Sequence, residues 1–157
     1  MWKSAPNLSY ERDAHCSLCL GDCAYVFAGS KNSHTGSIES LDVNHCHGWK
    51  ICVAPCYPVQ TRFPAVVAVN QSTIAVLGGD KSSKGYIFDT RTANYERIMG
   101  THKDLAFNCN THTLEVEQGK YITVGIGKDE HVHMIEFKLG DDSQFQARSI
   151  RDFGNYY

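Results

Sequence analysis

The stretch that decides the fold is Thr73-Ile74-Ala75-Val76-Leu77-Gly78-Gly79, a run of apolar and β-branched residues that ends in two glycines. This composition is typical of a buried strand. The glycines let the chain leave the strand with backbone dihedrals that a Cβ atom would oppose. An apolar run that closes in a glycine occurs twice more, from Ala24 to Gly29 and from Ile122 to Gly127, although only the second unit has two glycines in succession. The closing glycines, at positions 29, 79 and 127, are therefore spaced by 50 and 48 residues.

Two further markers keep the same period. A short strand pattern ends in an acid with spacings of 47 and 47, at Asp42, Asp89 and Glu136. A lone aromatic residue follows each acid with spacings of 46 and 50, at Trp49, Tyr95 and Phe145. Because three separate markers share one period, the chain contains an internal repeat of roughly 50 residues.

Each repeat predicts four short strands. In the second unit the strands are expected over residues 63–69, 73–77, 85–89 and 95–99, with a turn at 70–72. No segment combines a helical apolar period with helix caps, so little or no helix is expected. The predicted fold is all-β, with about three four-stranded antiparallel units in one domain over residues 1–157. The repeats are expected at about 12–61, 62–109 and 110–157, after a remnant at 1–11.

Composition excludes several classes of function. The chain of 157 residues has a net charge of −2, and its Lys and Arg residues form no cluster dense enough for binding to a phosphate backbone. Nucleic acid is therefore not an expected partner. No apolar run approaches the roughly 18 residues that span a bilayer, and residues 1–6 lack the apolar run of a signal peptide. We expect no membrane contact and a cytoplasmic location.

In their order, these markers resemble the kelch repeat. The second unit supplies Arg62, then Ile74 to Gly79, then Tyr86 to Asp89, with Tyr95 in the place of the usual tryptophan. The first unit supplies Arg12, Gly29, Asp42 and Trp49, and the third unit is the most degenerate. The resemblance implies a β-propeller in which each repeat is one blade. WD repeats are the alternative, but their period of roughly 40 to 45 residues is shorter.

The resemblance also implies an incomplete ring. Trp2-Lys3 followed by Pro6 and Arg12 resembles Trp49-Lys50 followed by Pro55 and Arg62, so Trp2 would belong to the outer strand of a further blade. About three blades leave the ring open. Further blades or self-association would then be needed to close it.

Seven cysteines offer a metal site as an alternative interpretation: Cys16, Cys19, Cys23, Cys46, Cys52, Cys56 and Cys109. A shift of 50 residues places Cys16 on Val66, Cys19 on Val69 and Cys23 on Thr73, which are strand positions. Residues three apart in a strand point to opposite faces, so Cys16 and Cys19 are not expected to share one ion. We therefore expect free thiols, no metal and no cofactor.

Catalytic motifs are also missing, and the chain is not expected to be an enzyme. The resemblance leaves kelch-type oxidases and epimerases as the alternative. Otherwise it implies a protein-interaction or scaffold module, such as the substrate-recruiting part of a ubiquitin-ligase adaptor. Partner contact is expected in the polar loops after each closing glycine, at Ser30, Lys31, Asn32, His34, Asp80, Lys81, Lys128, Asp129 and Glu130. The structural markers of the repeat are Gly29, Gly78, Gly79, Gly127, Trp49, Tyr95 and Phe145.

Overall fold

The computed structural model describes residues 4–29, 37–52, 61–80, 83–98, 107–139 and 145–155, and for 107–110, 145 and 151–155 it describes the backbone alone. These ranges contain twelve strands and no helix. The strands are β1 (Cys16–Leu20), β2 (Cys23–Phe27), β3 (Ile38–Asp42), β4 (Lys50–Ile51), β5 (Ala65–Asn70), β6 (Thr73–Leu77), β7 (Gly85–Asp89), β8 (Asn94–Ile98), β9 (Phe107–Glu117), β10 (Lys120–Gly127), β11 (His131–Leu139) and β12 (Phe145–Asn155).

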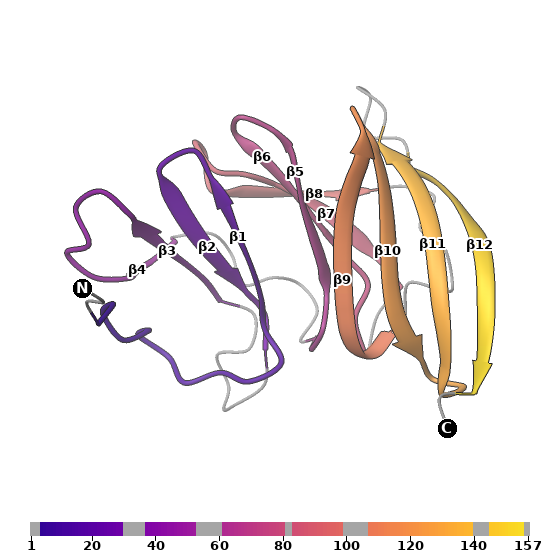
Figure 1. The fold of residues 1–157 in the computed structure, drawn as a ribbon. Helices are drawn as coiled ribbons and strands as arrows, with labels where there is room; N and C mark the ends of the chain where they lie inside the picture. The colour runs from indigo at the N-terminus through magenta and orange to yellow at the C-terminus, as the bar shows by residue number, and fades with distance from the viewer. Residues whose placement is uncertain are drawn as a thin grey trace.

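The strands form three four-stranded antiparallel sheets, in the orders β1-β2-β3-β4, β5-β6-β7-β8 and β9-β10-β11-β12. We call them sheets 1, 2 and 3, and they follow one another from left to right in Figure 1. The prediction of an all-β chain with three four-stranded antiparallel units is confirmed. In the second unit β6 and β7 occupy the expected ranges 73–77 and 85–89, and β8 begins one residue before its expected start.

The first strands of the three sheets, β1, β5 and β9, lie side by side and begin at the same end of the molecule (Figure 1). We call them the innermost strands because neighbouring sheets meet along them. The Phe63 amide, just before β5, donates to the Ala14 carbonyl, just before β1, at 2.8 Å. The Phe63 carbonyl in turn accepts from the Thr111 hydroxyl of β9 at 2.9 Å. These contacts tie each sheet to the next along its innermost strand.

Sheet 2 is covered on both faces, which explains the unbroken apolar run in its second strand. Ile74, Ala75, Val76 and Leu77 are all fully buried. Ile74 and Val76 pack into a cluster shared with sheet 1, which contains Tyr25, Phe27, Ile38, Ile74, Val76, Tyr86 and Phe88. Ala75 and Leu77 pack into a cluster shared with sheet 3, which contains Ala65, Val67, Ala75, Leu77, Ile98, Tyr121, Ile135, Phe137 and Leu139.

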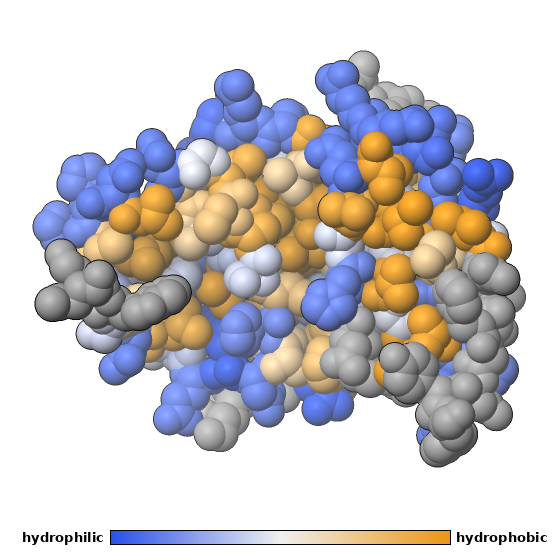
Figure 2. Space-filling model, in the orientation of Figure 1, coloured by the Kyte–Doolittle hydropathy of each residue, from blue (hydrophilic) through white to orange (hydrophobic). Residues whose placement is uncertain are grey.

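Sheet 3 differs from the other two in length and exposure. Its strands have 8 to 11 residues, whereas those of sheet 2 have 5 or 6. Register shifts interrupt the pairing of β9 with β10 and of β11 with β12. Leu114 on β9 is 68% exposed. Figure 2 shows apolar side chains extending from the centre of the molecule across the visible side of sheet 3.

The register also compares the three repeats directly. Asp42 pairs with Cys23 at the end of its hairpin, and Asp89 pairs with Thr73 in the same way. In sheet 3 this place belongs to Lys138, which pairs with Lys120, while Glu136 lies two residues earlier opposite Ile122. The third repeat has therefore shifted its acid relative to the hairpin that precedes it.

Candidate functional site

The loops that follow β2 and β6 begin with the same pair of unusual backbone angles. Ala28 and Gly29 have φ values of 58° and 100°, and Gly78 and Gly79 have 64° and 112°. A Cβ on Gly29 would lie 2.6 Å from the Asp13 carbonyl oxygen, and one on Gly79 would lie 2.7 Å from the Arg62 carbonyl oxygen. The second position of each pair therefore requires glycine, because the chain that enters the innermost strand passes against it.

In sheet 1 a buried arginine holds both ends of the β2–β3 loop. The Arg12 guanidinium donates to the carbonyl oxygens of Ala28 at 2.9 Å and Ser37 at 3.0 Å. It also donates to Glu39 Oε1 at 2.7 Å, and the two side chains are 3% and 0% exposed. Glu39 accepts further hydrogen bonds from the amides of Ser9 at 2.6 Å and Tyr10 at 3.3 Å. This saturation by donors lets a carboxylate lie fully buried.

In sheet 2 a different pair of residues holds the start of the β6–β7 loop. Asp80 Oδ1 accepts from the Arg62 amide at 2.7 Å, and Oδ2 accepts from Arg62 Nε at 3.0 Å. Thr61 is buried, and its hydroxyl donates to the Gly78 carbonyl oxygen at 3.4 Å. Phe63 and Ala14 share a positive φ of 54° and 52°. Thr61 therefore corresponds to Arg12, and Arg62 corresponds to Asp13. The structure thus does not align Arg62 with Arg12, as the sequence markers had done.

In sheet 3 the β10–β11 loop is a tight turn held by its own side chains. The Glu130 amide donates to the Gly127 carbonyl oxygen at 3.1 Å. Asp129 Oδ1 accepts from the His131 amide at 3.2 Å and lies 2.8 Å from His133 Nε2. The hydrogen bond with His133 holds the pKa of Asp129 below its ordinary value. Lys128 and Glu130 remain exposed at the tip.

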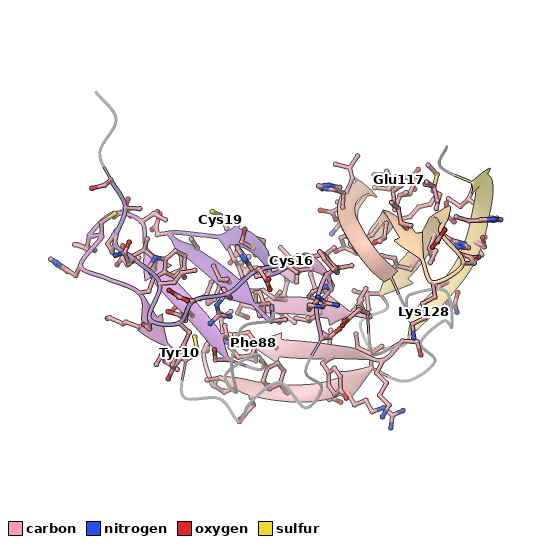
Figure 3. The ribbon with its side chains drawn as sticks, turned by 90° about the horizontal axis from the view of Figure 1, so that it is seen from below. Tyr10, Cys16, Cys19, Phe88, Glu117 and Lys128 are labelled. Carbon is pink, nitrogen blue, oxygen red and sulfur yellow. The ribbon has the colours of Figure 1, made fainter. Side chains whose placement is uncertain are left out.

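Four of the nine predicted partner-binding residues are among the described residues, and they lie in the loops after β6 and β10. Asp80 is half-buried and bonded to Arg62, while Lys128, Asp129 and Glu130 are exposed. The others, Ser30, Lys31, Asn32, His34 and Lys81, lie outside the described residues. Figure 3 views the molecule from below and labels Lys128 on sheet 3.

The cysteines of sheet 1 divide between the two faces of their strand, as expected for residues three apart. Cys16 and Leu18 point toward the interior, whereas Cys19 is exposed, and both cysteines are labelled in Figure 3. The Cys16 thiol donates to the Pro64 carbonyl oxygen. Burial raises its pKa to about 11. The register pairs Cys16 with Phe27 as it pairs Ala65 with Leu77, so Cys16 corresponds to Ala65 rather than to Val66.

The offset has a local cause in the structure. The ladder between β5 and β6 shifts between Ala68 and Asn70, so β5 contains one residue more than β1 over the same stretch. Among residues with described side chains, no group of three or more His, Cys, Asp or Glu is arranged to hold a metal ion. The side chains of Cys56 and Cys109 lie outside the described set.

Sequence reasoning did not identify Glu39 as a site residue. It is the second residue of β3, at the position where sheet 2 has the buried Tyr86. The signal that could have found it is this position itself, because an acid there needs a buried cation. Arg12, the arginine of the first repeat, bonds to Ala28, Ser37 and Glu39.

The described part of the chain contains no helix of the length and apolarity needed to cross a membrane. No protein-family model matches the chain, and no curated protein matches its sequence.

Proposed function

We propose that this chain is a protein-interaction module, built as an arc of kelch-type propeller blades, that binds a partner through the loops after β2, β6 and β10. The observation that carries the proposal is the repeated construction of the loop bases. Two of the loops leave their strands through the same pair of positive φ angles, and each base is fixed by a charged side chain, Arg12 or Asp80. Rigid bases that carry polar loops are the usual arrangement of a binding surface.

The arrangement of the sheets supports the propeller part of the proposal. Each four-stranded meander packs face to face on the next, with its innermost strand beside its neighbour's. The turns that begin with an aspartate after the third strand also repeat in sheets 1 and 2. Asp42 accepts hydrogen bonds from the amides two and three residues on, at 2.9 and 3.1 Å, and Asp89 does the same at 2.8 and 3.1 Å. A period of 47 residues between them favours kelch over WD repeats.

A charge exchange at the loop tip tests the proposal. Lys128→Glu combined with Glu130→Lys keeps the net charge but inverts its pattern on the exposed β10–β11 turn. The matched control exchanges Glu117 and Lys138, which are exposed in the same sheet. Proteins captured from the cell are quantified by mass spectrometry for the wild-type chain and both exchanged chains.

The proposal expects at least one captured protein to fall about fivefold or more with the loop exchange, since displaced interface charges cost about 1 kcal/mol or more each. The control exchange should retain it. Capture that is the same for the loop exchange and the wild type would show that this turn is not the binding surface.

A further inference from the structure

A cavity lies between sheets 2 and 3, independent of the loop surface proposed above. It has a volume of 970 Å³ and reaches the β5–β6 and β9–β10 turns, which close the hairpins at the ends of β5 and β9. One wall is the side of sheet 2 that carries Ile87 and Glu96, and the other is formed by Gln118, Gly119 and Leu139. The cavity has the size of a small-molecule or side-chain binding site, roughly 300 to 1,000 Å³.

The lining combines an apolar part, several uncharged polar residues and two carboxylates. Val69, Ile87 and Leu139 supply apolar surface, and Val69 and Ile87 pack on the core cluster below. Asp89 and Glu96 supply the only charges, since no Lys, Arg or His is among the described lining residues.

The two carboxylates differ in how far their charge is balanced. Asp89 accepts from the Arg91 guanidinium at 2.9 Å and from the amides of Arg91 and Thr92, and these bonds hold its pKa at about 2. Its charge is thus present at neutral pH but compensated by Arg91. Glu96 is exposed and, within the described chain, makes no ion pair. The net charge that faces the cavity is therefore negative and is located at Glu96, directly across the ladder from Ile87.

We propose that this cavity binds an alkylammonium group, with the aliphatic stem on Ile87 and Leu139 and the ammonium at Glu96. A primary amine on an aliphatic chain matches both parts of the lining, because such side chains bury their methylene stems while the charged head stays near water. Lysine side chains and free polyamines share this chemistry. The polar groups beside Glu96, among them Asn94, supply further acceptors for the ammonium protons.

The test uses the whole chain and two probes, hexalysine and spermidine, followed by amide chemical shifts and by calorimetry. Hexalysine acetylated on every side chain is the uncharged control for the peptide. Glu96→Gln removes the rim charge, and Glu11→Gln is the matched control because it makes the same change at an exposed residue before sheet 1 that does not line the cavity.

We expect at least one of the two amine probes to shift the amides of Ile87, Glu96 and Gln118. Glu96→Gln should weaken binding about fivefold, the effect of losing an exposed ion pair, while Glu11→Gln should leave it unchanged. Acetylation should abolish binding of the peptide. Binding of spermidine alone would identify a free amine as the ligand, and binding of hexalysine would identify a lysine side chain.

Three results would overturn the proposal: no shift with either amine, equal weakening by the Gln variants at positions 96 and 11, or undiminished binding by the acetylated peptide.

Discussion

Gly79→Ala should lower the free energy of unfolding by several kcal/mol more than Gly78→Ala does, although the two glycines are adjacent. At Gly78 φ is 64°, and sheet 1 already has an alanine at the corresponding position, Ala28, with φ of 58°. An L-residue in this left-handed region costs about 1–2 kcal/mol, partly offset by about 0.4–1 kcal/mol because alanine restricts the unfolded chain. Gly78→Ala should therefore lower the free energy of unfolding by no more than about 1.6 kcal/mol.

Gly79→Ala meets two penalties. Its φ of 112° lies beyond the left-handed helical region, which costs about 1–3 kcal/mol for a residue with a side chain. The new Cβ would also lie 2.7 Å from the Arg62 carbonyl oxygen, and relieving such overlap by backbone movement costs about 1–3 kcal/mol more. We expect a total loss of about 4 kcal/mol.

Urea denaturation followed by circular dichroism measures both values on the same chain. Gly21→Ala is the control for φ alone, because Gly21 has φ of 58° and nothing within 4 Å of the added methyl. It should behave like Gly78→Ala. The reasoning from the close approach of Arg62 is wrong if the two substitutions at 78 and 79 differ by less than about 0.5 kcal/mol, the usual range of unremarkable substitutions.

Three further outcomes follow from the contacts of single residues. Glu39→Gln leaves Arg12 buried without a counter-charge and should destabilise the chain by about 3–5 kcal/mol in urea denaturation; a loss below about 1 kcal/mol would contradict the pairing. Asp89 has a pKa of about 2 in the folded chain, below the unfolded value of about 3.9, so its contribution to stability is present above about pH 4 and is lost as the pH falls toward 2. An NMR titration should show that low midpoint, and Arg91→Ala should raise it. Alkylation by iodoacetamide at about pH 8 should modify exposed Cys19 well before Cys16, whose buried thiol has a pKa of about 11; equal rates in peptide mapping would contradict the burial of Cys16.

Strand positions in the second repeat could be predicted because local signals and tertiary environment agree there. The run from Thr73 to Leu77 is apolar or β-branched at every residue, and the structure buries both faces of β6 between two other sheets. The turn residues before it and the glycines after it mark its ends in the sequence. Where composition and burial point to the same strand, a period of 50 residues is enough to transfer the prediction to sheet 1.

The register of β5 and the details of sheet 3 could not be predicted in this way. A single extra residue in β5 moves the counterpart of Cys16 from Val66 to Ala65, and nothing in the apolar pattern marks such an irregularity. In sheet 3 longer strands carry Glu136 and Phe145 away from the places of Asp89 and Tyr95. Equal spacing in sequence does not ensure equal place in a sheet when strand lengths differ.

The ion pair between Arg12 and Glu39 could not be predicted from the sequence for another reason. Its partners include the amides of Ser9 and Tyr10 and the carbonyl oxygens of Ala28 and Ser37, so the site is mostly backbone. Backbone groups carry no sequence signal of their own. A carboxylate within a strand can be noted from sequence, but what neutralises it depends on which segment crosses it in three dimensions.

The contacts between neighbouring sheets also limit how far a disturbance can travel. Ala14 bonds to Phe63 and Phe63 bonds to Thr111, and Tyr121 donates to the Ala68 carbonyl oxygen across 53 residues, about one repeat. Each sheet therefore communicates chiefly with its nearest neighbour, as in a one-dimensional array. Opening of the exposed third sheet would loosen the second before the first, so amide hydrogen exchange should rise in a gradient along the chain rather than in one cooperative step. The three sheets are therefore expected to differ in local stability, with the first and the third opening at different rates.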